Sequence, residues 1–185
     1  MNKFTEILIT TIFILTSSSM VGCQTEQEVT AMTDQQQTNN PYYSHTDTTA
    51  LNIPNSTWKK VLPASVYAVA RDKETERAFT GKYTDFEGIG TYYCAVCGNK
   101  LFRSDSKFAS TCGWPSFFET ARQGSVTYQP DGSYGMNRIE VLCGRCGSHL
   151  GHLFDDGPPP TGKRYCMNSI VLEFSPDDTT HQQSK

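Results

Sequence analysis

The chain has 185 residues, a formal net charge of −3 and 37% hydrophobic residues. Globular domains usually contain roughly 100–150 residues, so this length predicts one domain with extensions. The charge balance argues against nucleic acid as a partner, and the hydrophobic share excludes a wholly disordered chain.

The N-terminus has the pattern of an export signal. An apolar run over residues 7–15 follows Lys3, and small residues then lead to Cys23. The run is too short to span a bilayer, which takes about 20 apolar residues; a buried helix is the alternative. Residues 20–23 (Met-Val-Gly-Cys) resemble a bacterial lipoprotein box. We therefore expect a signal peptide over residues 1–22 and an exported protein, either periplasmic or tethered to a membrane by lipidated Cys23. Ordinary cleavage nearby is the alternative.

Three further segments follow from composition. Residues 23–55 are rich in polar side chains and have too few large apolar residues for a core, which predicts a disordered tether. Apolar residues between Ser56 and Asp72 predict one or two short helices, broken near Pro63. We expect one domain over residues 56–176 and a polar tail over residues 177–185.

From Tyr92 onward, short β-type runs alternate with turn residues, which predicts an antiparallel all-β domain. Strict alternation in the last run would place five side chains on one face, namely Cys166, Asn168, Ile170, Leu172 and Phe174. Cys166 and Asn168 should then face the same cavity.

Four of the seven cysteines form two Cys-x-x-Cys-Gly turns, at Cys94 and Cys97 and at Cys143 and Cys146. Doubled turns of this kind are typical of a tetrahedral zinc site, and one metal would close the long segment between them. Disulfides and a thioredoxin-type motif are the alternatives. A bridge within either turn would close only a tiny loop and contribute little stability. We therefore expect one structural Zn²⁺ per chain.

Two further cysteines remain for redox chemistry. Cys112 lies in a loop that contains glycine and proline, whereas Cys166 follows Lys163 and Arg164, whose charges should favour a thiolate. A structural disulfide between Cys112 and Cys166 is the alternative, and composition alone does not decide between the two.

The order of motifs over residues 75–174 resembles the B-type methionine sulfoxide reductases. The matching segments are Thr75-Glu76-Arg77, both cysteine turns, Lys100-Leu101-Phe102 with Lys107-Phe108, residues 112–117 (CGWPSF), residues 146–152 with His149-Leu150-Gly151-His152, Asp156-Gly157-Pro158, and residues 164–169 (RYCMNS). The resemblance implies two small antiparallel sheets with short N-terminal helices, held together by the four-cysteine zinc site. Met167, Thr111 and Ala78 stand where the family commonly has valine, glycine and proline.

The resemblance also implies how the residues act. Cys166 attacks the sulfur of methionine (R)-sulfoxide and becomes a sulfenic acid; Cys112 resolves it as a disulfide, and a thioredoxin-like reductant recycles the enzyme. Trp114 and Arg164 bind the substrate, while His149, His152 and Asn168 complete the catalytic site. The expected substrates are oxidised proteins or free methionine sulfoxide.

Two other functions remain open from sequence. The first is a zinc-ribbon interaction module with a passive disulfide between Cys112 and Cys166. The second is a disulfide oxidoreductase that acts on proteins without needing Trp114 or His152. Sulfoxide turnover that depends on Cys166 would separate the reductase from both.

Overall fold

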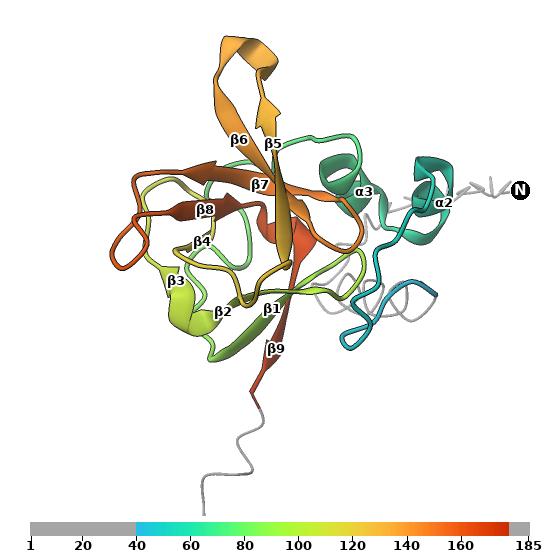
Figure 1. Ribbon diagram of the computed structural model, residues 1–185, viewed down its shortest axis with the longest axis horizontal. Helices are drawn as coiled ribbons and strands as arrows, with labels where there is room; N and C mark the ends of the chain where they lie inside the picture. The colour runs from blue at the N-terminus through green and yellow to red at the C-terminus, as the bar shows by residue number, and fades with distance from the viewer. Residues whose placement is uncertain (1–39, 178–185) are drawn as a thin grey trace, which may run out of the picture.

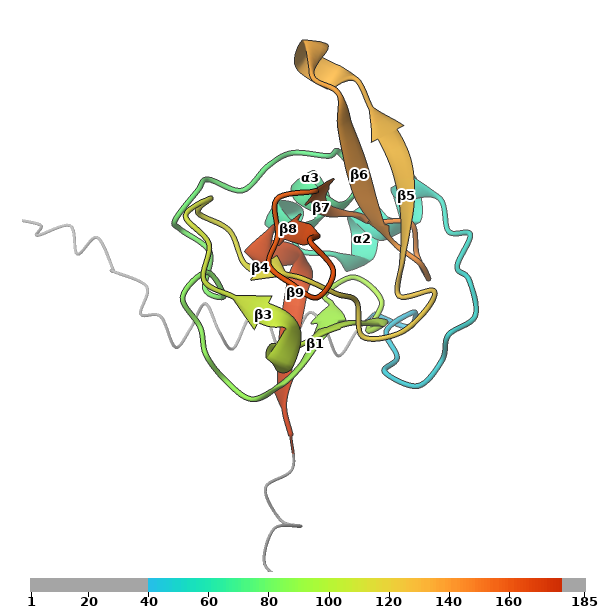
Figure 2. The same ribbon diagram turned by 60° about the vertical axis from the view of Figure 1, so that its left-hand side comes forward.

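The computed structural model describes residues 40–177 (Figures 1 and 2). The expected signal peptide, Cys23 and the end of the polar tail lie outside the described residues. Within them, no helix has the length and apolar character needed to cross a membrane.

Two short helices stand at the N-terminal edge of the domain: α2 (Asn55–Val61) and α3 (Ala64–Ala70). Pro63 lies between them because proline has no backbone N–H to extend the first helix, yet its fixed φ suits the start of the next. The helices bury Trp58, Val66 and Val69 against the domain. The prediction of two helices broken near Pro63 is confirmed.

The rest of the domain is two antiparallel sheets, as predicted. The smaller sheet has the order β2 (Lys100–Arg103), β1 (Gly90–Cys94), β9 (Leu172–Pro176). The larger has the order β3 (Lys107–Phe108), β4 (Ser116–Phe117), β8 (Arg164–Met167), β7 (His149–Phe154), β6 (Arg138–Cys143), β5 (Val126–Asp131). Short 3₁₀ turns lie at Ser104–Ser106, Ser133–Gly135 and Ser169–Val171.

Aromatic side chains from both sheets form the centre of the core. Tyr92 and Phe102 come from the smaller sheet, and Phe117 and Tyr165 come from the larger one. Phe102 stacks on Phe117 with ring centroids 4.3 Å apart, and Tyr92 meets Phe117 edge-on at 5.0 Å. Pairs of this kind add roughly 0.5–1.5 kcal/mol beyond the burial of their area. The core therefore fixes β4 and β8 against the smaller sheet.

The β5–β6 hairpin extends beyond the rest of the domain, at the top of Figures 1 and 2. Its register runs from Val126 opposite Cys143 to Asp131 opposite Arg138. The base of the hairpin thus begins at a cysteine of the second cysteine turn, and its outer end carries charged residues.

The last predicted strand is wrong beyond Met167. The chain leaves β8 there, makes the 3₁₀ turn Ser169–Val171 and enters the other sheet as β9. Uninterrupted alternation from Cys166 to Phe174 therefore does not occur, because the segment belongs to two sheets.

The prediction of a disordered tether is wrong for residues 40–53, which we call the N-terminal strap. The strap lies against both cysteine turns: the Asn40 side-chain amide donates to Val96 O at 2.8 Å, and Leu51 N donates to Arg145 O at 2.7 Å. Tyr42 also packs edge-on against Trp58, with ring centroids 5.2 Å apart. Backbone contacts hold the strap in place, which explains why its few apolar residues gave no indication of order.

Arg145 joins the strap to the cysteine turns. Its buried guanidinium donates to Tyr42 O at 2.8 Å, to Cys97 O at 2.5 Å and to Asp47 Oδ2 at 2.7 Å. We expect Arg145→Ala to lower the free energy of unfolding by about 2–3 kcal/mol, because it leaves buried carbonyls without a donor. Asp47→Asn is the matched control. It removes only the exposed end of the ion pair, so urea unfolding should show a much smaller loss than for Arg145→Ala. Equal losses in the two variants would contradict this account.

Candidate functional site

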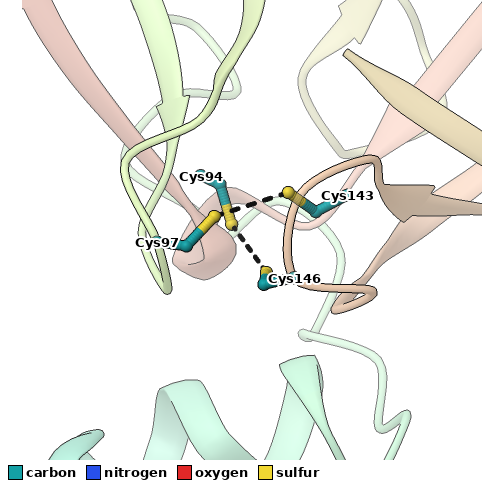
Figure 3. A group of neighbouring side chains, drawn as sticks. All are labelled: Cys94, Cys97, Cys143 and Cys146. Carbon is teal, nitrogen blue, oxygen red and sulfur yellow. Dashed lines mark hydrogen bonds between the residues drawn. The ribbon is translucent and has the colours of Figure 1, made fainter. Parts of the chain in front are cut away.

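The first functional feature is a buried cluster of four thiols, from Cys94, Cys97, Cys143 and Cys146 (Figure 3). Their sulfur atoms all lie within 4.8 Å of one another. Cys94 ends β1 and Cys97 lies in the turn that follows, while Cys143 ends β6 and Cys146 lies in the turn after it. The two turns predicted from spacing alone therefore converge on one point.

Both turns fold in the same way. Gly98 N donates to Cys94 O at 2.8 Å, and Gly147 N donates to Cys143 O at 2.9 Å. Each glycine has a positive φ, +75° and +66°, which a residue with a side chain rarely adopts. At Gly98 a Cβ would also lie 2.6 Å from Ser44 O in the strap. Glycine therefore both closes the turn and admits the strap.

The spacing of the sulfur atoms fits a metal ion. Cys94 Sγ lies 3.8 Å from Cys146 Sγ, and Cys97 Sγ lies 3.6 Å from Cys143 Sγ. Four sulfurs about 2.3 Å from a tetrahedral metal would be about 3.8 Å apart. A disulfide needs sulfurs about 2.05 Å apart, so the cluster has the dimensions of a metal site. The donor set of four thiolates suits a soft or borderline cation.

The second functional feature is a thiol pair on the larger sheet. Cys112 lies in the loop before β4, and Cys166 lies in β8. Their sulfur atoms are 3.3 Å apart, and both side chains are partly exposed. Cys112 Sγ also lies 3.4 Å from Ser116 Oγ. Two thiols so placed form a disulfide with little movement of the backbone.

Strand register aligns a row of polar side chains with Cys166. Ser116 of β4 and His152 of β7 lie directly opposite Cys166, Glu140 of β6 lies opposite His152, and Gln129 of β5 lies opposite Glu140. Directly opposed residues project from the same face of a sheet. The larger sheet therefore presents one thiol, one imidazole and one carboxylate in a line.

The two thiols of the pair differ in acidity. Burial and the neighbouring Cys112 raise the pKa of Cys166 to about 12, against the opposing charge of Arg164. Burial also acts to raise the pKa of Cys112, but contacts with Ser110, Ser116, the backbone of Trp114 and Cys166 lower it to about 7. In the resting pair, the thiolate is therefore favoured at Cys112. Arg164 acts on Cys166 in the expected direction, since it lowers the pKa of that thiol, but burial and Cys112 outweigh it.

This difference predicts the pH dependence of alkylation. We expect iodoacetamide to modify Cys112 with a midpoint near pH 7, and Cys166 only at much higher pH. In Cys112→Ser the midpoint for Cys166 should fall, because the neighbouring anion is gone. In Cys166→Ser the midpoint for Cys112 should rise, because a lowering contact is lost. Mass spectrometry of the labelled peptides measures both, and preferential labelling of Cys166 at pH 7 would contradict the assignment.

His149 is buried and paired with a carboxylate. Its Nδ1 lies 2.7 Å from Glu140 Oε1, and Lys73 Nζ donates to Glu140 Oε2 at 2.8 Å. Burial lowers the pKa of His149 despite Glu140, which favours the neutral imidazole. Its Nε2 is buried without a hydrogen-bond partner among the described residues. His149 therefore has one ring nitrogen anchored and one available.

His152 lies beside His149, with ring centroids 5.5 Å apart. Its Nε2 lies 2.7 Å from Asp131 Oδ2, at the outer end of β5. The structure thus brings both predicted histidines to the face that carries Cys166, and gives each its own carboxylate.

Trp114 and Asn168 meet at Glu76. The Trp114 indole N–H donates to Glu76 O at 3.0 Å, and Glu76 N donates to Asn168 Oδ1 at 2.9 Å. Asn168 is buried, and its amide also donates to Leu150 O at 3.1 Å. These hydrogen bonds of the Asn168 side chain are with backbone atoms, and they fix the segment that carries Glu76 next to Trp114.

Arg164 is held in place from two sides. Its guanidinium makes a two-point contact with Asp156, at 2.8 and 2.9 Å, and lies over the Phe154 ring at 4.3 Å. It is also close enough to Cys166 to oppose the rise in the pKa of that thiol. Arg164 therefore belongs to the same site as the thiol pair.

Sequence reasoning missed several residues of this site: Lys73, Ser110, Ser116, Gln129, Asp131, Arg138 and Glu140. Glu140 was detectable in principle, since its strand pairs with β7, which carries both candidate histidines, whereas Asp131 lies one strand further out, on β5. That signal requires the strand pairing, which sequence spacing does not supply.

Comparisons with known proteins give a consistent picture. Residues 62–176 match the SelR domain family. The "Peptide methionine sulfoxide reductase MsrB" of Methanosarcina barkeri is 54% identical over 125 residues, which cover 68% of this chain and 88% of that protein. The protein of the same name from Bradyrhizobium diazoefficiens is 54% identical over 119 residues, or 64% and 86% of the two chains. "Methionine-R-sulfoxide reductase B3, mitochondrial" of Mus musculus is 48% identical over 125 residues, or 68% and 49%.

Proposed function

Because the chain belongs to the B-type methionine sulfoxide reductases and is a peptide-methionine (R)-S-oxide reductase, we propose that it works through the thiol pair Cys112 and Cys166. The observation that carries this proposal is the distance of 3.3 Å between the two sulfur atoms, on the face that also presents His152. Cys166 is the nucleophile and Cys112 the resolving cysteine.

The first step sets the protonation of the pair. Cys112, the more acidic thiol, is the thiolate in the resting pair, so the reactive form is the minor one in which Cys166 carries the thiolate and Cys112 the proton. Arg164 favours this form because it opposes the rise in the pKa of Cys166. The Cys166 thiolate then attacks the sulfoxide sulfur. Trp114 packs against the methyl group of the substrate, and Arg164 orients its oxygen.

The second step transfers the sulfoxide oxygen from the substrate to Cys166. His152 gives a proton to the sulfoxide oxygen, the bond between oxygen and the methionine sulfur breaks, and the hydroxyl passes to Cys166. Methionine leaves as the thioether, and Cys166 is oxidised to a sulfenic acid. His149, neutral and anchored by Glu140, holds its free Nε2 in the site as a further hydrogen-bonding group.

The third step restores the enzyme. The Cys112 thiol attacks the sulfenic sulfur of Cys166, the hydroxyl leaves as water, and a disulfide forms. A thioredoxin-like dithiol reduces this disulfide by exchange. Oxidised proteins are the proposed substrate. Free methionine sulfoxide is a smaller substrate that carries the same sulfoxide group.

We also propose that the four-cysteine cluster holds one Zn²⁺. Four buried thiolates at tetrahedral spacing support this metal. Bound there, zinc would join the two turns and would have no open position for substrate. The N-terminal pattern supports export to the periplasm or attachment to a membrane through lipidated Cys23.

Turnover of separately resolved R and S sulfoxides by the full chain, with dithiothreitol as reductant, tests the proposed function. We expect reduction of the R epimer only, in both free and peptide-bound form. A folded, metal-loaded protein that reduces neither epimer would contradict the proposal.

A further inference from the structure

We propose that Asp131 is a positioning residue for His152, and that the protruding β5–β6 hairpin thereby forms part of the catalytic apparatus. The inference rests on the proposed function in taking His152 as the proton donor. Its own basis is the contact between Asp131 Oδ2 and His152 Nε2, at 2.7 Å.

Asp131 is itself held on several sides. Arg138 Nη2 donates to Asp131 Oδ2 at 2.6 Å, and Ser133 N donates to Asp131 Oδ1 at 3.0 Å. Arg138 Nη2 also reaches Ser133 Oγ at 3.2 Å. The side chains of Asp131 and His152 are only 16% and 14% exposed. A carboxylate with this many donors has a fixed direction, so it is suited to orient an imidazole.

Strand register explains why the carboxylate comes from the hairpin. Gln129, Glu140, His152 and Cys166 lie in one row across β5, β6, β7 and β8. Asp131 is two residues beyond Gln129 on the same face of β5, so it reaches His152 diagonally. Glu140, the residue directly opposite His152, is already engaged with His149. Since Glu140 pairs with His149, the carboxylate that contacts His152 is Asp131, at the outer end of the hairpin.

The contact decides which nitrogen of His152 faces the reaction. Hydrogen bonds from Ser133, His152 and Arg138 hold the pKa of Asp131 well below its usual range, so the carboxylate can only accept. His152 must then carry its proton at Nε2. Nδ1 is left to bind the sulfoxide oxygen, and it carries the transferable proton when the ring is charged.

The other charged or titratable groups around His152 are Arg138 and Glu140 on β6, His149 on β7, and Cys166 with Arg164 on β8. Arg138 is paired with Asp131, Glu140 with Lys73 and His149, and Arg164 with Asp156. Asp131 is the carboxylate that contacts the ring of His152 directly.

The test combines kinetics with the NMR signature of the ring. In the full-length enzyme, we expect Asp131→Ala to lower kcat on free methionine (R)-sulfoxide by about 10- to 100-fold, with KM within about twofold. Long-range ¹⁵N spectra of labelled histidine should change from the Nε2–H form of His152 to a mixture of tautomers. Asp131→Asn should keep the Nε2–H form, because its amide oxygen still accepts, and should therefore retain more of the activity than Asp131→Ala.

Asp155→Asn is the matched control, because it removes an exposed carboxylate that is paired with Lys163. It should leave both kcat and the His152 spectrum unchanged. An unchanged tautomer in Asp131→Ala would overturn the proposal, as would a kcat equal to that of the wild type. A purely structural role would instead lower the melting temperature without changing the tautomer. The spectrum reports the contact independently of turnover, so inactivity of the wild-type enzyme would contradict the proposed function alone.

Discussion

Cys166→Ser should abolish reduction of methionine (R)-sulfoxide, with a fall in kcat of about 10³-fold or more. Serine cannot supply a thiolate to the sulfoxide sulfur, and no other thiol on this face replaces it, since Cys112 would have to act from the loop before β4. Stopped assays with dithiothreitol and free substrate measure the effect without a protein reductant.

Cys112→Ser is the matched variant, because it removes the other thiol of the same pair. Attack by Cys166 should survive, so one equivalent of methionine forms in a single turnover and dithiothreitol sustains further cycles. With a thioredoxin as the reductant, turnover should stop, because no intramolecular disulfide forms. If Cys166→Ser remained active, or if both variants were equally inactive in a single turnover, the assigned roles would be wrong. A passive disulfide would allow both variants to work.

The cysteine chemistry was largely predictable from sequence. Doubled turns with two residues between the cysteines specify a four-sulfur cluster through local geometry, and the structure places all four sulfurs together. Cys112 and Cys166 remained as the spare thiols, and they lie in contact. These predictions succeed because each depends on a short segment with a distinctive conformation, and because the matching motifs span most of the domain.

The strand β7 shows where sequence reasoning was limited. Its residues, His149–Phe154, were taken as a motif of functional side chains and were not predicted as a strand. Gly151 at its centre weakens the β pattern, yet the structure requires it: a Cβ there would lie 2.0 Å from Cys166 O. The glycine allows close approach of β8, which sets His152 opposite Cys166.

Asp131 and the strap were missed for a different reason. Asp131 stands next to Gly132 and Ser133, a sequence typical of a turn, but β5 continues through it, and its partner His152 is distant in sequence. Order in the strap depends on backbone carbonyls of the cysteine turns and on Arg145. These groups lie outside the strap, so the composition of the strap does not reveal them. Composition measures the ability to form a core, whereas these segments are held by contacts that form only after the domain folds.

Loss of the metal should have the second large effect, on stability. The four cysteines link the turn after β1 in the smaller sheet to the turn after β6 in the larger one. Structural zinc contributes about 10–16 kcal/mol of apparent binding free energy in small zinc domains, and this energy is coupled to folding. We expect Cys143→Ser to lower the melting temperature by roughly 20 °C or to prevent folding, as a loss of about 5 kcal/mol or more would.

Cys112→Ser provides the control, because it makes the same chemical change outside the cluster. It should bind one zinc per chain and melt within a few degrees of the wild type. Metal content by elemental analysis and unfolding by circular dichroism distinguish the two variants. Since Asn40 and Ser44 of the strap bond to the turn that carries Cys97, proteolysis within residues 40–53 should accelerate when zinc is removed with a chelator. A metal-free protein with unchanged melting and an intact strap would show that packing alone holds the two sheets together.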